Sequence, residues 1–410
     1  MKIGVISEAP TLKTGFGTTC SVLVSALASN GHEVAVFGIG AFGETFNRSS
    51  YPAKIWAVGK SSEHTFGYLS DFLTYEKPNA LLLNSDIVAV NRWLTLCKAI
   101  GWKGPVVAHM VLDGLPINPE YLTSLAELTH IITPTNTGAI YLKRVGISKV
   151  TTVPHGVDLE VFRPLPDRKD LKSAAGLSGK FVVGVLGRNA ERKQHTRVLL
   201  ALAELKAAKQ ADDLVLYLHC QIKDDPALGG WNLLEVAKEL DIDDIVLFPD
   251  NTFTQLEGVP YVNKQGQLQH PLVRSTVPTI PREFGYVQRI NICDLIINAA
   301  YCGGFELAII EAQACAVPLA VTDDNGIMAE VAGDGALLMK PIDIGIWRTG
   351  ARQYFVSPHT IADVIKQVRA NSELRKRLSE KGYANAHSFC WDKLKNAVIA
   401  VFGDIELHKN

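Results

Sequence analysis

The sequence predicts an α/β protein made of two doubly wound parallel-sheet domains. Short runs rich in Val, Ile and Leu alternate with helical patterns along most of the chain, which is typical of parallel strands covered by helices on both faces. The chain has 410 residues, which is too long for one compact core and favours two domains. We therefore expect one sheet in each half of the chain.

The composition favours a cytoplasmic protein without an integral membrane segment. No apolar run approaches the roughly 20 residues that a membrane-spanning helix needs. The seven cysteines are odd in number, scattered and mostly set in apolar runs, a pattern typical of reduced, buried thiols. A core strand is expected from residue 2, so no signal peptide is expected. A formal net charge of −1 gives no overall attraction to nucleic acid or to anionic membranes.

The first domain is expected to span residues 1–165. Its predicted strands are residues 2–6, 33–37, 80–84, 105–109, 129–133 and 149–153. A helix predicted over residues 20–30 ends at Asn30-Gly31, because glycine commonly terminates a helix. The join to the second domain is expected near residues 162–166, where two prolines fall close together.

The second domain is expected to span residues 166–390. Its predicted strands are residues 180–186, 213–218, 244–248, 294–298, 317–321 and 335–339. Residues 251–289 contain four prolines and no clear period, which predicts an irregular insertion, either a lid or a passive surface loop. A final apolar helix within residues 391–410 is predicted to return to the first domain.

Doubly wound sheets bind ligands at the carboxyl ends of their strands, so two facing sheets predict one inter-domain cleft. Gly15 and Gly17 follow the first strand, where backbone amides at a helix start can face an anion. His109 ends a later strand of the same sheet. At that edge it could bind a sugar hydroxyl or act as an acid or base, and a purely structural role is the alternative.

Two cations follow the first strand of the second domain. Arg188 lies in the expected loop and Lys193 in the expected first helical turn, so the pair can flank a diphosphate. A lysine at a helix N-terminus opposes the helix dipole, which indicates an anionic ligand. A solvated charged loop is the alternative interpretation.

The most informative stretch is residues 303–312. Gly303 and Gly304 stand between an expected strand and an apolar helix, where glycine lets a ligand approach the backbone amides. Glu311, one turn into that helix, can accept hydrogen bonds from ribose hydroxyls. An ordinary strand–helix loop with a solvent-facing glutamate is the alternative.

In register, these motifs resemble the retaining glycosyltransferases of family 4, which have the GT-B fold of two Rossmann-like domains. The resemblance covers nearly the whole chain. The matching features are the glycine loop at residues 15–17, the domain join at residues 155–164, the cations Arg188 and Lys193, the block at residues 294–318, and the loop at residues 325–330.

The resemblance implies transfer of a sugar from a nucleotide donor, such as a UDP- or GDP-sugar, to an acceptor hydroxyl with retention of anomeric configuration. Arg188 and Lys193 would neutralise the departing diphosphate, and His109 would lie near C6 of the sugar. No metal or other cofactor is expected. The acceptor would bind the first domain and is unidentified: a saccharide, a lipid-linked molecule or a nucleic acid.

The resemblance also assigns a donor site. The backbone of Gly304, Phe305, Glu306 and Leu307 would contact the phosphate and the donor sugar, and Glu311 would hold the ribose. The pattern departs from the family at Gly303, where a catalytic-site carboxylate usually stands, and at Glu306, where a glycine is usual. Glu306 is therefore the candidate to supply the missing carboxylate from a shifted position.

Two other functions stay open from the sequence. The absence of a carboxylate at Gly303 is compatible with a catalytically silent nucleotide-sugar-binding protein. A GT-B sugar-nucleotide epimerase, or a sugar phosphorylase, is the other enzyme alternative, although the ordered motifs favour a transferase.

Overall fold

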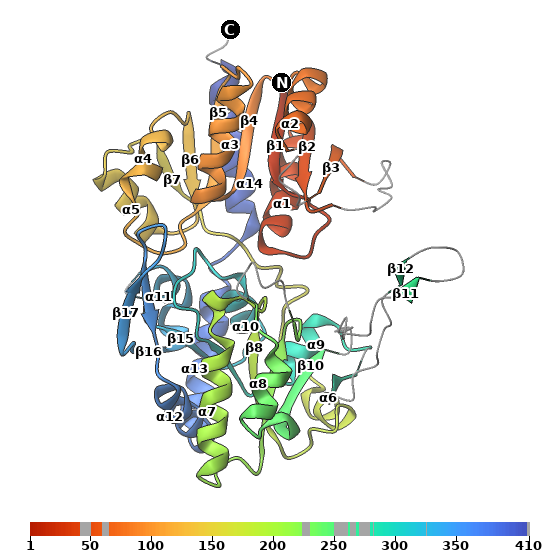
Figure 1. Cartoon of the computed structure of the whole chain (residues 1–410), viewed down its shortest axis with the longest axis vertical. Helices are drawn as coiled ribbons and strands as arrows, with labels where there is room; N and C mark the ends of the chain where they lie inside the picture. Colours follow the sequence, from red (N-terminus) through yellow and green to blue (C-terminus); the bar gives the residue numbers. More distant parts are fainter. Residues whose placement is uncertain are drawn as a thin grey trace.

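The computed structural model describes residues 1–41, 51–59, 65–223, 230–249, 261–262, 268–269, 279–281, 283–324 and 326–407. Two α/β domains lie one above the other along the long axis of the molecule (Figure 1). Each contains a seven-stranded parallel sheet, which confirms the predicted fold class. Most of the predicted insertion at residues 251–289, and Asn325, lie outside the described residues.

The first sheet has the strand order β3-β2-β1-β4-β5-β6-β7. Its strands are β1 Lys2–Glu8, β2 Glu33–Ile39, β3 Lys54–Val58, β4 Ala80–Asp86, β5 Val106–Val111, β6 His130–Thr133 and β7 Val150–Thr152. The six strands expected in this domain are confirmed, whereas edge strand β3 was not predicted. Only Val58 of β3 is buried, so its sequence lacks the apolar run that marks the central strands.

Helices cover both faces of the first sheet, because successive residues of each strand point to opposite sides. These helices are α1 Gly15–Ser29, α2 Thr65–Glu76, α3 Ile87–Ala99, α4 Pro119–Leu125 and α5 Asn136–Arg144. In β4, Leu82 packs with α1, whereas Leu81 and Leu83 pack with α2 and α3. The expected start of the first helix at residue 20 is wrong, because Thr14 caps the helix and Gly15 begins it.

The second sheet has the strand order β13-β10-β9-β8-β14-β15-β16. Its strands are β8 Phe181–Leu186, β9 Leu214–His219, β10 Val246–Pro249, β13 Thr279–Ile280, β14 Leu295–Asn298, β15 Leu319–Thr322 and β16 Ala336–Met339. All six strands expected there are confirmed, and β13 is an additional two-residue edge strand.

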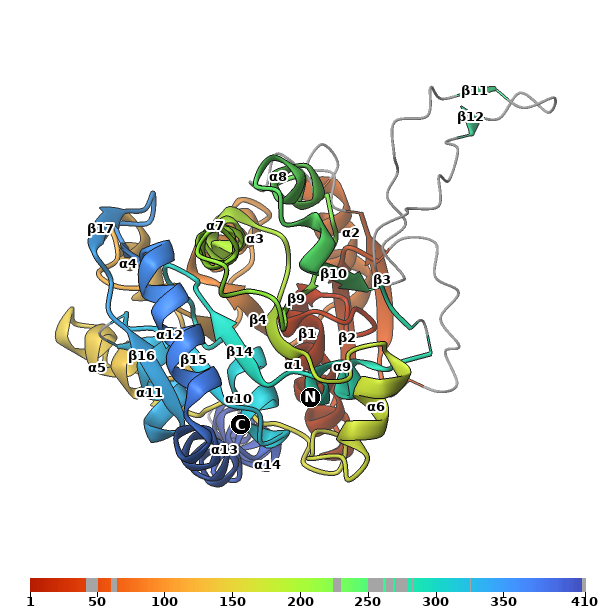
Figure 2. The ribbon, with the colours of Figure 1, turned by 90° about the horizontal axis from the view of Figure 1, so that it is seen from below.

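Figure 2 shows the helices around this second sheet. They are α6 Arg168–Ala174, α7 His195–Ala207, α8 Leu233–Glu239, α9 Tyr286–Asn291, α10 Leu307–Ala314, α11 Ile327–Ala332, α12 Pro358–Ala370 and α13 Ser372–Ala386. Helices α7, α8 and α12 share one apolar cluster with the sheet, and α9, α10 and α11 share the other. Among the helices described, none is long and apolar enough to cross a membrane.

The last helix, α14 Trp391–Leu407, packs on the first domain rather than the second. Its residues Val398 and Phe402 are buried in one apolar cluster with Leu23 and Leu27 of α1. The N-terminal ammonium of Met1 contacts Glu406 Oε1 at 3.0 Å. The two termini of the described chain therefore meet on the same domain (Figure 1).

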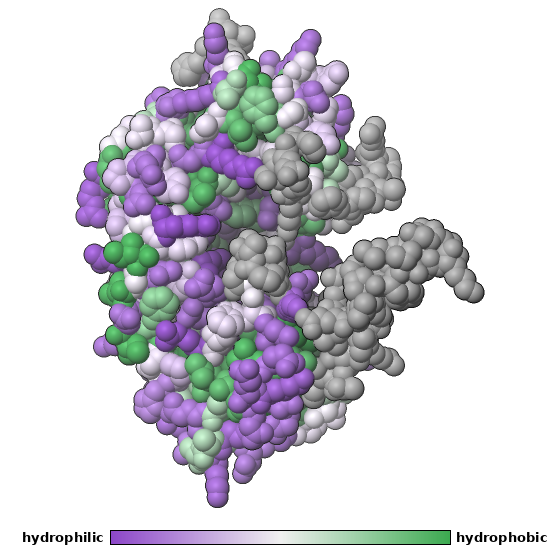
Figure 3. Space-filling view, viewed as in Figure 1, coloured by the Kyte–Doolittle hydropathy of each residue, from purple (hydrophilic) through white to green (hydrophobic). Residues whose placement is uncertain are grey.

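Two small antiparallel hairpins complete the described elements. One joins β11 Tyr261–Val262 to β12 Leu268–Gln269, inside the expected insertion, and the other joins β17 Asp343–Ile346 to β18 Arg352–Phe355. Ile342, Ile344 and Ile346 are 53–78% exposed, and Figure 3 shows apolar residues over β17. The hairpin was not predicted, since its isoleucines alternate outward rather than into a core.

Candidate functional site

The loop after β1 meets the second domain. Thr14 Oγ1 accepts a hydrogen bond from the Gly17 amide at 3.0 Å, which caps α1. A Cβ atom added at Gly15 would lie 3.8 Å from Leu307 Cδ1 of α10, so Gly15 faces the predicted donor helix. A Cβ atom at Gly17 would lie 2.2 Å from the Leu12 carbonyl oxygen. Gly17 is therefore required by packing within its own turn, and Gly15 is the glycine that faces the cleft.

The loop before α10 is pressed against the end of β5. A Cβ atom at Gly304 would lie 2.7 Å from Val111 Cβ and 2.8 Å from Asp113 Oδ1. Phe305 is 3% exposed, and its ring lies 4.5 Å from the His155 ring at the domain join. Glycine at 304 and the buried ring at 305 thus fix this loop of the second domain against the first.

Glu306 binds two cations. Its Oε1 accepts a hydrogen bond from Arg192 Nη1 at 2.5 Å, and its Oε2 accepts one from Lys193 Nζ. The Glu306 side chain is only 5% exposed. Burial by itself would raise the pKa of Glu306, but attraction to Lys193 and Arg192 outweighs it and lowers the pKa to about 2. Glu306 is therefore a carboxylate at neutral pH.

Glu306 also occupies the space next to Gly303. A Cβ atom added at Gly303 would lie 2.6 Å from Glu306 Cγ and 2.8 Å from its Oε1. The backbone of Glu306 has φ 62°, in the left-handed region that favours glycine. The side chain of residue 306 thus folds back over the position from which a side chain at 303 would project.

The predicted cation pair differs in part from the cluster that forms. Lys193 ends a short 3-10 turn, Glu191–Lys193, instead of lying in the first turn of α7, and its side chain runs alongside Gly187. Arg188 is exposed in the loop after β8, and the second cation on Glu306 is Arg192. The sequence interpretation missed Arg192, although it lies within the basic segment between Arg188 and Lys193.

Glu311 lies inside α10 beside an aromatic cluster. Its Oε2 accepts a hydrogen bond from Tyr286 Oη at 2.9 Å. Burial raises the pKa of Glu311 to about 7, although this hydrogen bond opposes the shift. The Tyr286 ring lies 4.6 Å from the His219 ring and 6.0 Å from the Phe162 ring. Tyr286 and His219 were not predicted as site residues, since neither belongs to a recognisable motif.

His109 lies beneath the cleft and has no solvent exposure. Its Nδ1 is 2.7 Å from Asn84 Oδ1, and its Nε2 is 3.2 Å from His155 Nε2. Asn84 donates in turn to Ser7 Oγ and to the Phe16 carbonyl oxygen. Burial lowers the pKa of His109 to about 4, so the ring is neutral at pH 7. His109 of β5 therefore links β4, through Asn84, to the domain join, through His155.

Glu330 of the predicted loop at residues 325–330 links the domains directly. Its carboxylate accepts hydrogen bonds from the amides of Asn136 and Thr137 at 2.7 and 2.8 Å, and from Thr137 Oγ1 at 2.7 Å. A side chain of α11 therefore caps the N-terminus of α5 in the other domain. Across the described part of the chain, no group of three His, Cys, Asp or Glu side chains is arranged to hold a metal ion.

Part of the second domain matches a known family of sequences. Residues 284–385 match the family model described as glycosyl transferases group 1. The D-inositol 3-phosphate glycosyltransferase of Stackebrandtia nassauensis is 26% identical over 290 residues, which cover 68% of this chain and 55% of that protein. The protein of the same name from Mycobacterium marinum is 25% identical, with 64% and 47% covered. The chain thus matches about half the length of these curated relatives.

Solved structures share the whole architecture. The Anabaena protein HepE in complex with UDP and glucose superposes with a TM-score of 0.67 at 15% identity, covering 98% of this chain and all of that one. Sucrose-phosphate synthase from Thermosynechococcus elongatus gives a TM-score of 0.72 at 16% identity, with both chains fully covered. The predicted GT-B fold and the resemblance to glycosyltransferases are confirmed.

Proposed function

Since residues 284–385 form a glycosyl transferases group 1 domain within a GT-B fold, we propose that the protein moves a sugar from a nucleoside diphosphate donor to an acceptor hydroxyl. The cluster of Glu306, Arg192 and Lys193 carries this proposal. It stands at the start of α10, where Gly15 of the first domain faces Leu307. Retention of anomeric configuration and independence from metal are part of the proposal.

The cluster suits the departure of a diphosphate. Lys193 and Arg192 bring two cationic groups to the site, and both pair with Glu306. With exposed Arg188 in the neighbouring loop, they would stabilise the negative charge that develops on the leaving group. The chemistry proposed here is therefore positioning and charge stabilisation, and the departing phosphate would accept the proton of the acceptor hydroxyl.

The remaining donor contacts follow from position. Glu311 would accept hydrogen bonds from the ribose hydroxyls once a nucleotide displaces or shares the Tyr286 hydroxyl. His109, being buried, would act by holding the loop beneath the sugar rather than by touching it. The solved HepE complex contains UDP and glucose, so UDP-glucose is the first donor to test. The names of the curated relatives add inositol phosphates to the acceptors worth testing.

A catalytically silent nucleotide-sugar-binding protein is the second candidate, and Gly303 favours it, because a side-chain carboxylate is missing there. A thermal-shift screen of UDP, GDP and their sugars, followed by NMR of the products, separates the candidates. We expect a nucleoside diphosphate to raise the melting temperature of the protein. The corresponding nucleotide sugar should be hydrolysed slowly when no acceptor is present. Stabilisation without any donor turnover would favour the silent protein, an epimerised nucleotide sugar would favour an epimerase, and no nucleotide binding would contradict all three.

A further inference from the structure

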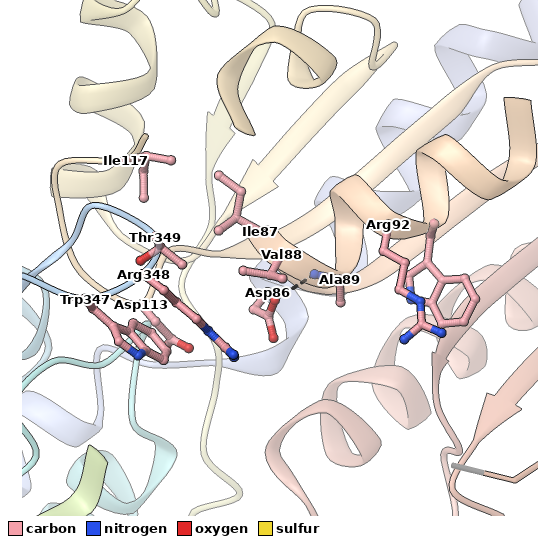
Figure 4. A pocket seen from close by; sticks show the side chains of 11 residues that line it. Asp86, Ile87, Val88, Ala89, Arg92, Asp113, Ile117, Trp347, Arg348 and Thr349 are labelled. Atoms are coloured by element: carbon pink, nitrogen blue, oxygen red, sulfur yellow. Dashed lines mark hydrogen bonds between the residues drawn. The ribbon is translucent and has the colours of Figure 1, made fainter. Parts of the chain in front are cut away.

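A cavity of about 200 Å³ lies beside the donor site and is lined by both domains. Figure 4 shows Trp347, Arg348 and Asp113 on one side, Arg92 on the other and Asp86 between them. Trp347, Arg348 and Thr349 come from the tip of the β17–β18 hairpin, whereas Asp86 and Arg92 come from the end of β4 and from α3. The cavity is smaller than the ~300–1,000 Å³ typical of pockets for drug-sized ligands, so it suits one sugar-sized unit.

The hairpin tip is held firmly against the first domain. Asn118 donates from its amide to the Thr349 carbonyl oxygen at 2.8 Å and from its side chain to the Arg348 carbonyl oxygen at 3.0 Å. Gly350 has φ 86°, and a Cβ atom there would lie 2.4 Å from Asn118 Oδ1. The wall that the hairpin contributes is therefore fixed by backbone contacts and does not depend on the side chains that face the cavity.

Asp113 connects this cavity to the donor site. Its carboxyl group lines the cavity and also abuts Gly304, since a Cβ atom at Gly304 would lie 2.8 Å from Asp113 Oδ1. Burial raises the pKa of Asp113, the nearby Arg192 opposes the shift, and Asp86 and Glu306 add to it. The Asp113 carboxyl group therefore lines the cavity and also interacts with the charges of the cluster around Glu306.

The lining combines three kinds of recognition chemistry. Asp86 and Asp113 can accept hydrogen bonds from hydroxyl groups, and Trp93 and Trp347 offer apolar ring surface. Within the residues that the structure describes, neither Arg92 nor Arg348 forms an ion pair, and each guanidinium lies over a tryptophan, at 5.5 and 5.6 Å from the ring centres. Two guanidinium groups without carboxylate partners, one from each domain, are suited to a phosphate.

Thr349 provides an independent sign of a ligand. It lines the cavity and is 3% exposed, yet its hydroxyl has no hydrogen-bond partner in the described part of the protein. An unpaired buried hydroxyl costs free energy that a ligand oxygen would recover.

We infer that this cavity is the acceptor site, and that the acceptor is a small polyhydroxylated molecule carrying a phosphate, with Arg92 and Arg348 binding the phosphate and Asp86 and Asp113 binding hydroxyls. This inference rests on the proposed function. It places the acceptor between the domains, with the β17–β18 hairpin of the donor domain supplying part of the binding surface. The reacting hydroxyl would lie next to Asp113, on the side that faces Glu306.

Calorimetric titration with UDP present tests the inference. The probes are hexose 6-phosphates and inositol monophosphates, their neutral parents, and glucuronate as a carboxylate-bearing arm. We expect at least one phosphorylated probe to bind at least about tenfold more tightly than its neutral parent, as expected for charge-assisted hydrogen bonds. Arg348→Gln and Arg92→Gln should each remove most of this preference.

Arg352→Gln is the matched control, because Arg352 is exposed on the same hairpin and does not line the cavity. It should keep the preference, and melting temperatures of all variants check folding. Four results would each overturn the inference. The phosphorylated and neutral probes could bind equally well, or none of them could bind. Glucuronate could bind more tightly than every phosphate, or the preference for phosphate could survive both substitutions. Failure of the proposed function is a separate result, seen as wild-type protein that turns over no nucleotide sugar.

Discussion

At the residue scale, Glu306 has an unfavourable backbone conformation, but its side chain forms favourable ion pairs. Its left-handed φ of 62° costs a residue with a Cβ atom about 1 kcal/mol relative to glycine. The same backbone points its carboxylate at the partly buried cations Arg192 and Lys193, with which it forms two ion pairs. The motif predicted a displaced carboxylate at residue 306. It did not predict Arg192 as a partner, because 114 residues separate the two positions and only the fold brings them together.

In its proposed role as the acceptor for ribose hydroxyls, Glu311 should make nucleotide binding depend on pH. Its pKa of about 7 means that the carboxylate, the better acceptor for ribose hydroxyls, predominates above pH 7 and is lost as the pH falls below it. We expect UDP affinity to fall by up to about tenfold per pH unit below 7. Titrations between pH 8 and 6 measure this.

Glu311→Gln is the control, because glutamine cannot titrate. Its affinity should follow only the ionisation of the nucleotide phosphate itself. Superimposable pH profiles for the wild type and Glu311→Gln would show that Glu311 does not bind the ribose as a carboxylate.

At the element scale, the domain join crosses the start of α14 with no free space. The Val157 amide donates to the Phe389 carbonyl oxygen at 3.3 Å, and the His155 ring lies 5.9 Å from the Trp391 ring. A Cβ atom at Gly156 would lie 2.2 Å from the Trp391 backbone nitrogen. The domain join and the start of α14 therefore pack tightly together, and the His155 ring of this join also contacts the Phe305 ring.

Gly156→Ala should therefore destabilise the protein by about 1–3 kcal/mol, as overpacking does. Gly67→Ala is the matched control, because Gly67 lies exposed within α2 with nothing within 4 Å of an added Cβ atom. It should stabilise the protein by about 0.5–1 kcal/mol. Chemical denaturation of both variants measures the two changes, and equal stabilities would contradict the packing described at the join.

The same scale shows what the sequence could predict. β8 is an unbroken apolar run and β4 begins with one over residues 80–83; both strands were predicted, since burial on both faces leaves a continuous pattern. The start of α1 was misplaced, because Gly15 and Gly17 read as loop residues although Thr14 caps a helix that contains them. The β17–β18 hairpin was missed because its isoleucines face outward and its tip packs on Asn118, which lies 230 residues away in the sequence.

At the scale of the whole molecule, the two domains touch at several places, and three of these contacts come from separate elements of the second domain. The loop at Gly304 meets Val111, the hairpin tip meets Asn118, and Glu330 caps α5. All three lie near the carboxyl ends of the first sheet. A donor bound to the second domain would therefore face a first domain that is already in contact with it.

Glu330→Ala should loosen one of these contacts without unfolding either domain. The backbone amides of Asn136 and Thr137 lose their acceptor, so their hydrogen exchange should accelerate at least about tenfold. Exchange in the core strands should stay unchanged. Asp334→Ala is the control, since Asp334 follows the same helix and its side chain is 92% exposed. Unchanged exchange at these two amides would show that Glu330 does not hold the domains together in solution.

Whether Glu306 supplies the carboxylate that is missing at Gly303 can be measured through the rate of sugar transfer, in a cycle of single and double substitutions. Glu306→Gly should lower the rate on the order of 100-fold, and Gly303→Glu should lower it because the new side chain would collide with Glu306. The double variant Gly303→Glu/Glu306→Gly returns the carboxylate to residue 303 and relieves the left-handed backbone. We predict that it transfers sugar faster than either single variant. Full activity in Glu306→Gly, or a double variant no faster than the single ones, would show that Glu306 does not supply this carboxylate.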